Sequence, residues 1–337
     1  AQARPASPKG TTGPPGRLGS ISVSTPALEI RDLVVSYGDR QVVRNLTLDA
    51  HAGAITAVLG PNGAGKTTTI ECAEGLRTPN SGSITVLGHA AGSPAARARV
   101  GVMLQDSGLP MARSAQDVLN LACAMRSNPV PTDELLTTFG LQDARRTPVR
   151  RLSGGQRQRL AFAVAIASRP AVVFLDEPSA GLDPHARRDV WSVVRSLRDA
   201  GTAVVLTTHL IDEAEALADQ VHLLVDGAVI ASGTPRELVA QFAGDDTVRL
   251  VLARPLTALE LADLSTAVAP THVEVDGEAL ILRGDASPSF IARLARWCAD
   301  HEVAILTLRA GGGTLELAYL ALTERATTAR IAREASE

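Results

Sequence analysis

A glycine-rich stretch between an apolar run and a helix-forming run constrains the fold of this chain more than any other feature. Residues Gly60 to Thr67 fit the phosphate-loop pattern, in which Gly and any four residues precede Gly-Lys-Thr. The apolar run from Ala54 to Leu59 predicts a buried strand before the loop, and no Pro or Gly follows Lys66 until Gly75. This order of strand, loop and helix is the context that the motif requires. A glycine-rich turn without a ligand is the alternative.

The chemistry of this loop suits phosphate binding. Glycines lack a Cβ, so successive backbone N–H groups can turn toward phosphate oxygens while the following helix presents its positive end. Lys66 would bring its charge to the β and γ phosphates of a nucleotide, and Thr67 would bring a hydroxyl to Mg²⁺. The only other lysine is Lys9. The pattern Gly-x-Gly-x-x-Gly is absent from this turn, which disfavours a dinucleotide site. The predicted nucleotide-binding residues of the loop are Gly60, Pro61, Asn62, Gly63, Ala64, Gly65, Lys66, Thr67 and Thr68.

Length and composition limit the possible classes of protein. A chain of 337 residues with 45% hydrophobic content can bury one large core and a smaller one, so we expect two domains. The net charge of -3 shows no overall bias toward nucleic acid, and we expect no nucleic-acid partner. The longest apolar run, residues 160–167, is far shorter than the roughly 20 residues of a membrane helix. The three cysteines have no metal or disulfide spacing, which favours reduced thiols in a cytoplasmic protein.

Strands and helices can be placed around the loop from the spacing of apolar residues. Apolar and polar residues alternate over 28–35 and 41–48, which predicts a β-hairpin. Tyr37 lies at its turn, where the ring could stack on a base or merely pack on the surface. A predicted strand ends at Gln105, a position that is uninformative by itself. From about 112 to 165 the apolar residues recur at helical spacing, which predicts a helical insertion in an α/β core.

A serine and two glycines precede the last helix of that insertion. Ser153 predicts an N-cap, because its side chain can accept a hydrogen bond from the first turn of the helix. Gly154 and Gly155, followed by Gln156, would leave backbone N–H groups exposed at the positive end of the helix. The stretch is therefore either a simple capped helix or a second anion-binding site.

Polar residues follow two further buried strands. Residues 171–175 predict a short strand with Asp176 and Glu177 at its carboxyl end, where ligands bind in open α/β sheets. Asp176 there would suit Mg²⁺ binding and Glu177 would suit the role of a general base, although an acidic pair can also lie in a solvated loop. His209 follows the apolar run 203–206, from which it could reach a γ phosphate or serve only a structural role.

Taken in order, these motifs resemble the ATP-binding subunit of an ATP-binding cassette (ABC) transporter, and the resemblance covers residues 28–240. It implies an α/β fold, namely a P-loop ABC ATPase domain with a mixed sheet, an antiparallel β subdomain and a helical insertion. It also implies hydrolysis of ATP with Mg²⁺. No motif residue departs from the family pattern. The resemblance assigns adenine stacking to Tyr37, Mg²⁺ and membrane-subunit contact to Gln105, the signature to Leu152–Gln156, metal binding to Thr67 and Asp176, catalysis to Glu177, a dimer contact to Asp183 and the switch function to His209.

The resemblance also implies partners. Two such domains stack head to tail in the family, so Ser153 and Gly155 of one copy would reach the γ phosphate held by Lys66 of the other. Because every motif is intact, we expect a homodimer with two competent sites. The family further implies a separate multi-span permease, which places this chain at the cytoplasmic face of the cell membrane. ATP-driven closure and reopening of the dimer would then power export by the permease, with a drug or an antibiotic as the expected kind of cargo.

The sequence predicts four segments. Residues 1–26 are rich in Pro, Gly, Ser and Thr and predict a disordered tail, and 27–244 form the ATP-binding domain. Residues 245–323 alternate strands and helices, which predicts a small α+β C-terminal domain. This part resembles the C-terminal extension of the daunorubicin-resistance type of ABC exporter ATPases, whose last helix has a pattern similar to residues 313–320. Residues 324–337 form a charged tail.

Two other functions remain possible from the sequence. The first is a soluble ABC ATPase that acts on DNA or ribosomes. The DNA-linked members carry long coiled coils between the phosphate loop and the signature, but this chain has no sustained heptads there. The translation-linked members carry two cassettes in one chain, and this chain has one. The second is an importer ATPase whose C-terminal domain senses a ligand, which the gene neighbourhood would distinguish from an exporter.

Overall fold

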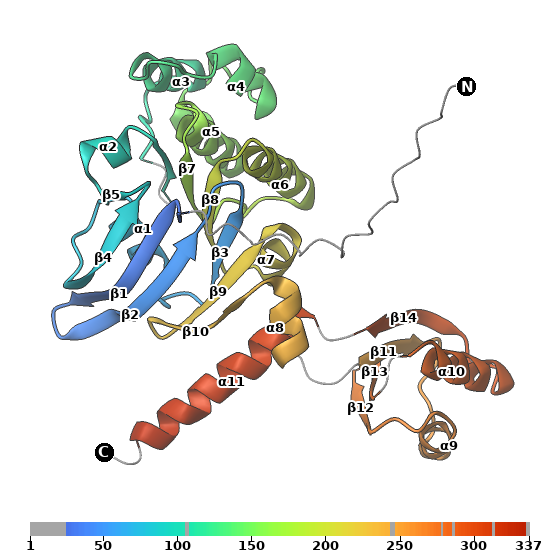
Figure 1. The fold of residues 1–337 in the computed structure, drawn as a ribbon. Coiled ribbons are helices and arrows are strands. Elements are labelled where there is room, and N and C mark those ends of the chain that lie inside the picture. Colours follow the sequence, from blue (N-terminus) through green and yellow to red (C-terminus); the bar gives the residue numbers. More distant parts are fainter. Residues whose placement is uncertain are drawn as a thin grey trace, which may run out of the picture.

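The computed structural model of the chain describes residues 25–104, 108–242, 247–277, 279–284, 287–311 and 314–334. Figure 1 shows a larger body that holds most of the elements and a smaller body beneath it. The predicted N-terminal tail lies almost entirely outside the described residues, and so does Gln105.

A six-stranded sheet forms the centre of the larger body, in the order β10-β9-β3-β8-β7-β6. All neighbours from β9 to β6 are parallel, and β10 pairs antiparallel with β9 at one edge. Because β3, β7 and β8 are adjacent and parallel, the residues that follow them meet at one edge of the sheet. The strands are β3 (Ile55–Leu59), β6 (Val100–Met103), β7 (Val172–Asp176), β8 (Ala203–Thr208), β9 (Gln220–Val225) and β10 (Ala228–Gly233).

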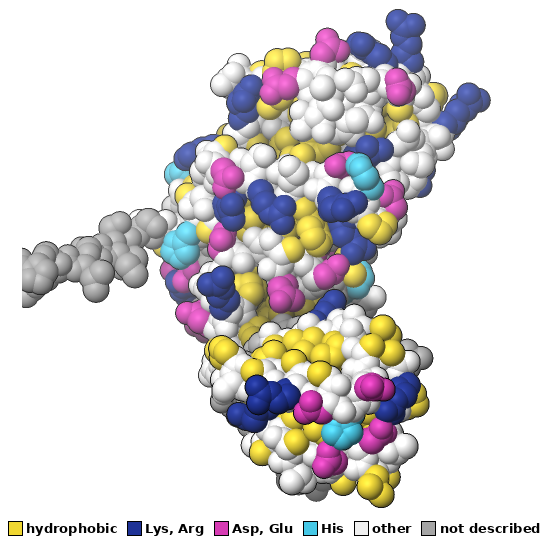
Figure 2. All heavy atoms as spheres, turned by 90° about the vertical axis from the view of Figure 1, so that its right-hand side faces the viewer, with side chains coloured by type: hydrophobic (Ala, Val, Ile, Leu, Met, Phe, Trp, Pro, Cys, Tyr) yellow, Lys and Arg dark blue, Asp and Glu magenta, His cyan; other side chains and the backbone are white. Residues whose placement is uncertain are grey.

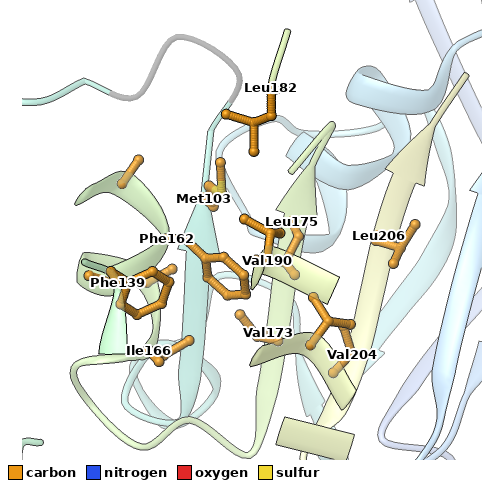
Figure 3. Packing of buried hydrophobic residues seen from close by; sticks show 14 of the residues in the cluster. Met103, Phe139, Phe162, Ile166, Val173, Leu175, Leu182, Val190, Val204 and Leu206 are labelled. Atoms are coloured by element: carbon orange, nitrogen blue, oxygen red, sulfur yellow. The ribbon is translucent and has the colours of Figure 1, made fainter. Parts of the chain in front are cut away.

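Side chains of the central strands alternate between two cores, one on each face. On β7, Val173 and Leu175 face a cluster of helices, whereas Val172 and Phe174 face the opposite cluster. Residues of β8 alternate in the same way. Burial on both faces is why these strands appear in the sequence as continuous apolar runs. Figure 3 shows the helical side, where Phe162 packs beside Phe139 and over the side chains of β7.

A second, antiparallel sheet covers the other face, with the order β2-β1-β4-β5. Its first two strands, β1 (Leu28–Tyr37) and β2 (Arg40–Ala50), form the predicted hairpin, and β4 (Ser81–Val86) and β5 (His89–Ala90) extend it. The helix α1 (Lys66–Ala73) lies between the two sheets and contributes to the same core, to which the short helix α2 (Pro94–Arg97) adds Ala96. The predicted fold class, with a mixed sheet and an antiparallel β subdomain, is confirmed.

The predicted helical insertion is present on the far side of the central sheet. It consists of α3 (Ala115–Ala124), α4 (Thr132–Thr138), the 3₁₀ turn η1 (Val149–Arg151) and α5 (Gly154–Ile166). The rings of Phe139 and Phe162 lie 5.2 Å apart and join the end of α4 to α5. The helices α6 (Pro184–Asp199), α7 (Ile211–Leu217) and α8 (Pro235–Phe242) complete this layer.

The smaller body is a two-layer α+β unit with its own core. Its sheet has the order β12-β13-β11-β14 and is antiparallel throughout. Two helices cover one face, and Phe290, Leu294 and Trp297 fill the core between the layers. The elements are β11 (Thr247–Leu252), α9 (Ala258–Val268), β12 (His272–Asp276), β13 (Ala279–Arg283), α10 (Pro288–Asp300) and β14 (Ile305–Gly311).

The last helix, α11 (Leu315–Glu334), corrects one sequence-based assignment. We expected the helix from Thr314 to belong to the small domain, but α11 packs on the ATP-binding domain instead. Leu315, Ala318, Tyr319 and Leu322 recur at i, i+3, i+4 and i+7, which places them on one face of the helix. They pack against residues of β3, β9 and α8, namely Leu59, Val221, Leu223 and Leu238. Figure 1 shows α11 running back beneath the larger body, and the helix continues to Glu334 through much of the segment that we expected to be a charged tail.

No helix in the described ranges is both long enough and apolar enough to span a bilayer. Figure 2 shows one face of the molecule, where Lys and Arg side chains are interspersed with Asp and Glu.

Candidate active site

The phosphate loop follows β3 and leads directly into α1. Gly65 is the N-cap of α1 and has a φ of 100°, a left-handed conformation that favours glycine. At Gly60, a Cβ would lie only 2.2 Å from the carbonyl oxygen of Leu224, so a side chain cannot be accommodated there. The two glycines therefore set the path of the loop. The N-terminus of α1, which is the positive end of the helix, faces the space that the loop encloses.

Lys66, at the start of α1, is held inside the loop. Its Nζ donates hydrogen bonds to the carbonyl oxygens of Gly60 at 2.8 Å and Pro61 at 3.1 Å. It also forms an ion pair with Glu177, with Nζ and Oε1 3.7 Å apart. Burial lowers the pKa of the Lys66 ammonium, and the charges of Glu177 and Asp176 partly oppose that effect.

Asp176, the last residue of β7, accepts hydrogen bonds from two threonines. Thr67 Oγ1 on α1 donates to Oδ2 at 3.0 Å, and Thr207 Oγ1 on β8 donates to Oδ1. Burial raises the pKa of the Asp176 carboxyl, whereas the two hydroxyl hydrogen bonds lower it. The result is a buried carboxylate fixed between the phosphate loop and the neighbouring strand.

Glu177 has a left-handed backbone conformation, with a φ of 49°. Its N–H donates to both the carbonyl oxygen and the Oγ1 of Thr207, each at 3.1 Å. Its carboxylate lies between Lys66 and His209, whose Nδ1 is 3.0 Å from Oε2. A non-glycine residue with this φ is strained by about 1–3 kcal/mol and persists only where the surroundings hold it. The site therefore fixes the direction of this carboxylate.

The N-terminus of α5 is satisfied within its own first turn. Gln156 N donates to Ser153 Oγ at 3.1 Å, and Ser153 N donates to Gln156 Oε1 at 2.9 Å, which is a capping box. Arg157 donates to the carbonyl oxygen of Leu152 at 2.6 Å. Ser153 and Gly154 are exposed, so the backbone N–H groups at this helix end face solvent.

Asp183 and Tyr37 lie at exposed positions away from the buried centre. Asp183 caps α6 by accepting from the N–H groups of His185 and Ala186, both at 2.9 Å, and these hydrogen bonds lower the pKa of its carboxyl. Tyr37 is 46% exposed at the end of β1. The guanidinium of Arg77 lies over its ring, 4.5 Å from the centroid.

The structure brings part of the predicted set into one cluster. Lys66, Thr67, Asp176, Glu177 and His209 are linked by direct hydrogen bonds and ion pairs. The α5 cap, Asp183 and Tyr37 are separate from this cluster. Gln105 lies outside the described residues, so its predicted contact with Mg²⁺ stays a prediction.

Sequence reasoning missed several residues of the site. Thr207 bonds to both Asp176 and Glu177, and pairing the two strands would have found it, since Asp176 and Thr207 are register partners. Arg77 could not be linked to Tyr37 from the sequence, because they lie 40 positions apart. Glu74, buried at the end of α1, also had no signal in the sequence pattern.

Comparison with known proteins identifies the family. The ABC transporter family matches residues 43–180. The daunorubicin/doxorubicin resistance ATP-binding protein DrrA of Streptomyces peucetius is 36% identical over 323 residues, which cover 93% of this chain and 97% of that protein. The chain belongs to the ABC transporter ATP-binding proteins. The Nod factor export ATP-binding protein I of Ralstonia nicotianae is 35% identical over 314 residues, 90% of this ABC protein and 95% of that relative.

Solved structures support the same fold for this ABC ATPase. An ATP-binding subunit of an ABC transporter superposes with a TM-score of 0.59 at 27% identity, covering 64% of this chain and 92% of that one. The dimeric cassette MJ0796, in a post-hydrolysis state bound to ADP and Pi, superposes with a TM-score of 0.57 at 22% identity, covering 61% of this chain and 98% of that one. At 22% identity, the similarity to MJ0796 shows a shared fold alone.

Proposed function

We propose that this chain is the ATP-hydrolysing subunit of an exporter, that it acts as a head-to-tail homodimer, and that it drives a separate membrane permease. The observation that carries the proposal is the cluster of Lys66, Asp176, Glu177 and His209 in a chain that matches DrrA over 93% of its length. The match includes the small C-terminal domain as well as the cassette. Relatives named for daunorubicin resistance and Nod factor export favour a cargo of the drug or antibiotic type.

The residues of the cluster suit hydrolysis of a γ phosphate. The loop N–H groups and Lys66 bind phosphate oxygens, because a phosphate can replace the carbonyl oxygens that Lys66 Nζ now contacts. Glu177 accepts a proton from the attacking water, and the left-handed backbone directs its carboxylate toward the loop. His209, 3.0 Å from that carboxylate, orients it and reaches toward the γ phosphate.

The donor set fits Mg²⁺. Thr67 Oγ1 and Asp176 Oδ2 are hard oxygen donors 3.0 Å apart, and Mg²⁺ takes one or two protein oxygens together with phosphate oxygens and water. In the described ranges no group of three or more His, Cys, Asp and Glu side chains could hold a metal alone, which agrees with that sparse kind of site. Mg²⁺ neutralises charge on the β and γ oxygens when bound. Gln105 is proposed as a further ligand.

The exposed cap of α5 supports the dimer. Ser153 caps the helix, and Gly154 and Gly155 stand in its first turn, where backbone N–H groups have no partner within the helix, so the positive end is a ready surface for a phosphate. In this proposal they serve the nucleotide held by Lys66 of the second copy. Asp183, exposed at the start of α6, contacts that copy, and Tyr37 stacks on adenine.

A cleft beside the acids supports docking of the permease. It has a volume of about 540 Å³ and lies between α5 and the ends of β6 and β7. Apolar residues line its outer part, among them Leu104 and Met111, which are 37% and 56% exposed. A membrane helix or loop can insert apolar side chains there. Through this contact the chain would lie at the cytoplasmic face of the membrane.

Glu177→Gln tests the proposal. Because glutamine cannot accept the proton, ATP hydrolysis should slow by roughly 10²- to 10⁴-fold while ATP binding remains. The variant should also accumulate as an ATP-bound dimer, measured by light scattering after gel filtration. Glu215→Gln, an exposed carboxylate on α7, is the matched control. Normal hydrolysis by Glu177→Gln would show that another group is the base, and a monomer under all nucleotide conditions would exclude the dimer.

A further inference from the structure

One contact links the signature helix to the catalytic carboxylate of the same chain. Gln158 lies on α5, one turn beyond the capped N-terminus. Its Nε2 donates to two backbone carbonyl oxygens, those of Glu177 and Pro178, each at 2.8 Å. Both hydrogens of this amide are therefore used on the main chain at and directly after the proposed base.

These hydrogen bonds act where the backbone is strained. Glu177 has a φ of 49°, and its N–H is held from β8 by Thr207. The carbonyl side is held by Gln158, together with the N–H of Ala180 at 3.2 Å. Strained residues keep their conformation only where several contacts determine it. Gln158 is thus one of the contacts that set the direction of the Glu177 carboxylate.

The helix that carries Gln158 is anchored in the core by Phe162. Phe162 lies one turn beyond Gln158 on the same face and is fully buried against α4 and the central sheet (Figure 3). The cleft is lined by Gly154, Arg157 and Gln158 on one side and by Asp176 and Glu177 on the other. A shift of the N-terminus of α5 would therefore reach the Glu177 backbone through the Gln158 amide.

We propose that Gln158 is a positioning residue for Glu177 and that it couples the two nucleotide sites of the dimer. This inference rests on the proposed head-to-tail dimer. There, α5 of one chain contacts the nucleotide bound to the second copy, whereas Glu177 of that same chain acts on its own nucleotide. Closure of α5 on one nucleotide then sets the carboxylate at the other site, so hydrolysis responds to occupancy of both.

The test compares Gln158→Leu with the wild-type full chain. Leucine keeps the size of the side chain but removes both donors, so kcat should fall by roughly 10- to 100-fold. The ATP concentration at half-maximal rate should change by less than about threefold, since binding is not affected. The Hill coefficient for ATP should fall toward one. Gln142→Leu is the matched control, because the amide of Gln142 donates only to the surface hydroxyl of Thr137.

A second measurement distinguishes positioning of Glu177 by Gln158 from a purely structural role of Gln158 in α5. In the Glu177→Gln background, adding Gln158→Leu should leave the ATP-dependent dimer unchanged, because the carboxylate it positions is already removed. Loss of that dimer would show that Gln158 only stabilises α5, and a wild-type kcat and Hill coefficient in Gln158→Leu would exclude the coupling. A wild-type chain that neither hydrolyses ATP nor dimerises would instead overturn the proposed function, and this inference with it.

Discussion

The acid centre and the cap of α5, the two regions proposed to contact phosphate, are built differently. In the acid centre, Lys66, Asp176 and Thr207 are buried. Asp176 accepts hydrogen bonds from Thr67 and Thr207, and Lys66 forms an ion pair with Glu177, so the contacts join three elements. In the cap, the side chains of Ser153 and Gln156 bond to each other's backbone N–H within one turn, and the helix end faces solvent. The centre depends on the whole sheet for its geometry, whereas the cap needs a single turn of helix.

This difference explains how one chain can supply halves of two sites. A buried centre binds its ligand with groups that the fold has already aligned, so it needs no partner for phosphate binding. An exposed, self-satisfied cap gains a charge partner only when a phosphate is brought to it. This contrast fits the proposed head-to-tail dimer, in which the centre and the cap of one chain serve different nucleotides.

Mixing two inactive variants tests this assignment and should give the largest effect. Lys66→Ala removes the phosphate cation from the centre, and Ser153→Glu places a negative charge at the cap. Each variant alone should lose at least about 10²-fold in ATP hydrolysis, since every site then contains one defect. In a mixed dimer one site carries both defects and the other carries none. An equal mixture should therefore contain mixed dimers with one intact ATP site. Its rate should recover to at most about a quarter of the wild-type rate, and the proposed coupling through Gln158 lowers that recovery, because the second site is defective.

The rate should depend on the mixing ratio and be greatest at equal amounts. A mixture of Lys66→Ala with Lys66→Arg is the control, because both variants alter the same half-site and should not complement each other. If mixed dimers of the Lys66 and Ser153 variants hold ATP no more tightly than either variant alone, the centre and the cap belong to one nucleotide and the assignment is wrong.

Burying a carboxylate near the acid centre lowers the stability of the fold, and Glu74, whose pKa responds to Asp176, allows this loss to be measured. Glu74 is 6% exposed, and neither carboxylate oxygen has a hydrogen-bond partner. Burial, reinforced by the charges of Asp176 and Glu71, raises the pKa of this carboxyl from 4.5 to about 8. A raised acid pKa means that the folded chain retains a proton that the unfolded chain loses. Stability is therefore lost as the pH rises from about 4.5 to about 8.

Glu74→Gln should remove that loss. We expect no change in the free energy of unfolding near pH 4.5 and a gain on the order of 4 kcal/mol above pH 8. Urea denaturation at several pH values measures it. Glu215→Gln changes charge equally at an exposed site and should give a flat difference. An equal effect of Glu74→Gln at all pH values would mean that the carboxyl is ionised, with a partner that compensates for its burial.

The same contrast accounts for what the sequence could predict. The cap and the phosphate loop are local, so Ser153, Gly65 and Lys66 could be assigned from a few consecutive residues. The strands were found because burial on both faces leaves continuous apolar runs. The acid centre joins residues far apart in the chain. Asp176, Glu177 and His209 could be predicted because each lies at the carboxyl end of a predicted strand, but the threonine that holds the two acids could not. Thr207 becomes meaningful once β7 and β8 are in register.

The C-terminal helix shows the limit of sequence patterns for packing. Leu315, Ala318 and Leu322 predict a helix with one apolar face, and α11 has that face. Nothing in the spacing says which surface will cover it. Proximity in sequence favoured packing of this helix on the adjacent small domain. The structure instead places the apolar face of α11 against Leu238 of α8, although the whole small domain separates the two helices in the sequence. Several surfaces could bury the same apolar area of α11, so the fit between the shapes of the packed side chains decides which surface covers it.

Tyr37 gives the smallest expected effect, because it belongs to neither region and would contact only the base. Its ring is 46% exposed and has Arg77 over it. Stacking on a base is worth about 1–3 kcal/mol, and a ring this exposed gains the lower part of that range, so Tyr37→Ala should raise the KM for ATP by roughly 5- to 20-fold without changing kcat. Tyr37→Phe keeps the ring and should change KM little.

Arg77→Ala should have a smaller effect than Tyr37→Ala, because it only frees the ring to move. Since stacking is tolerant of base identity, KM for GTP should shift by the same factor. A fall in kcat at unchanged KM would instead connect Tyr37 to the chemistry of the acid centre.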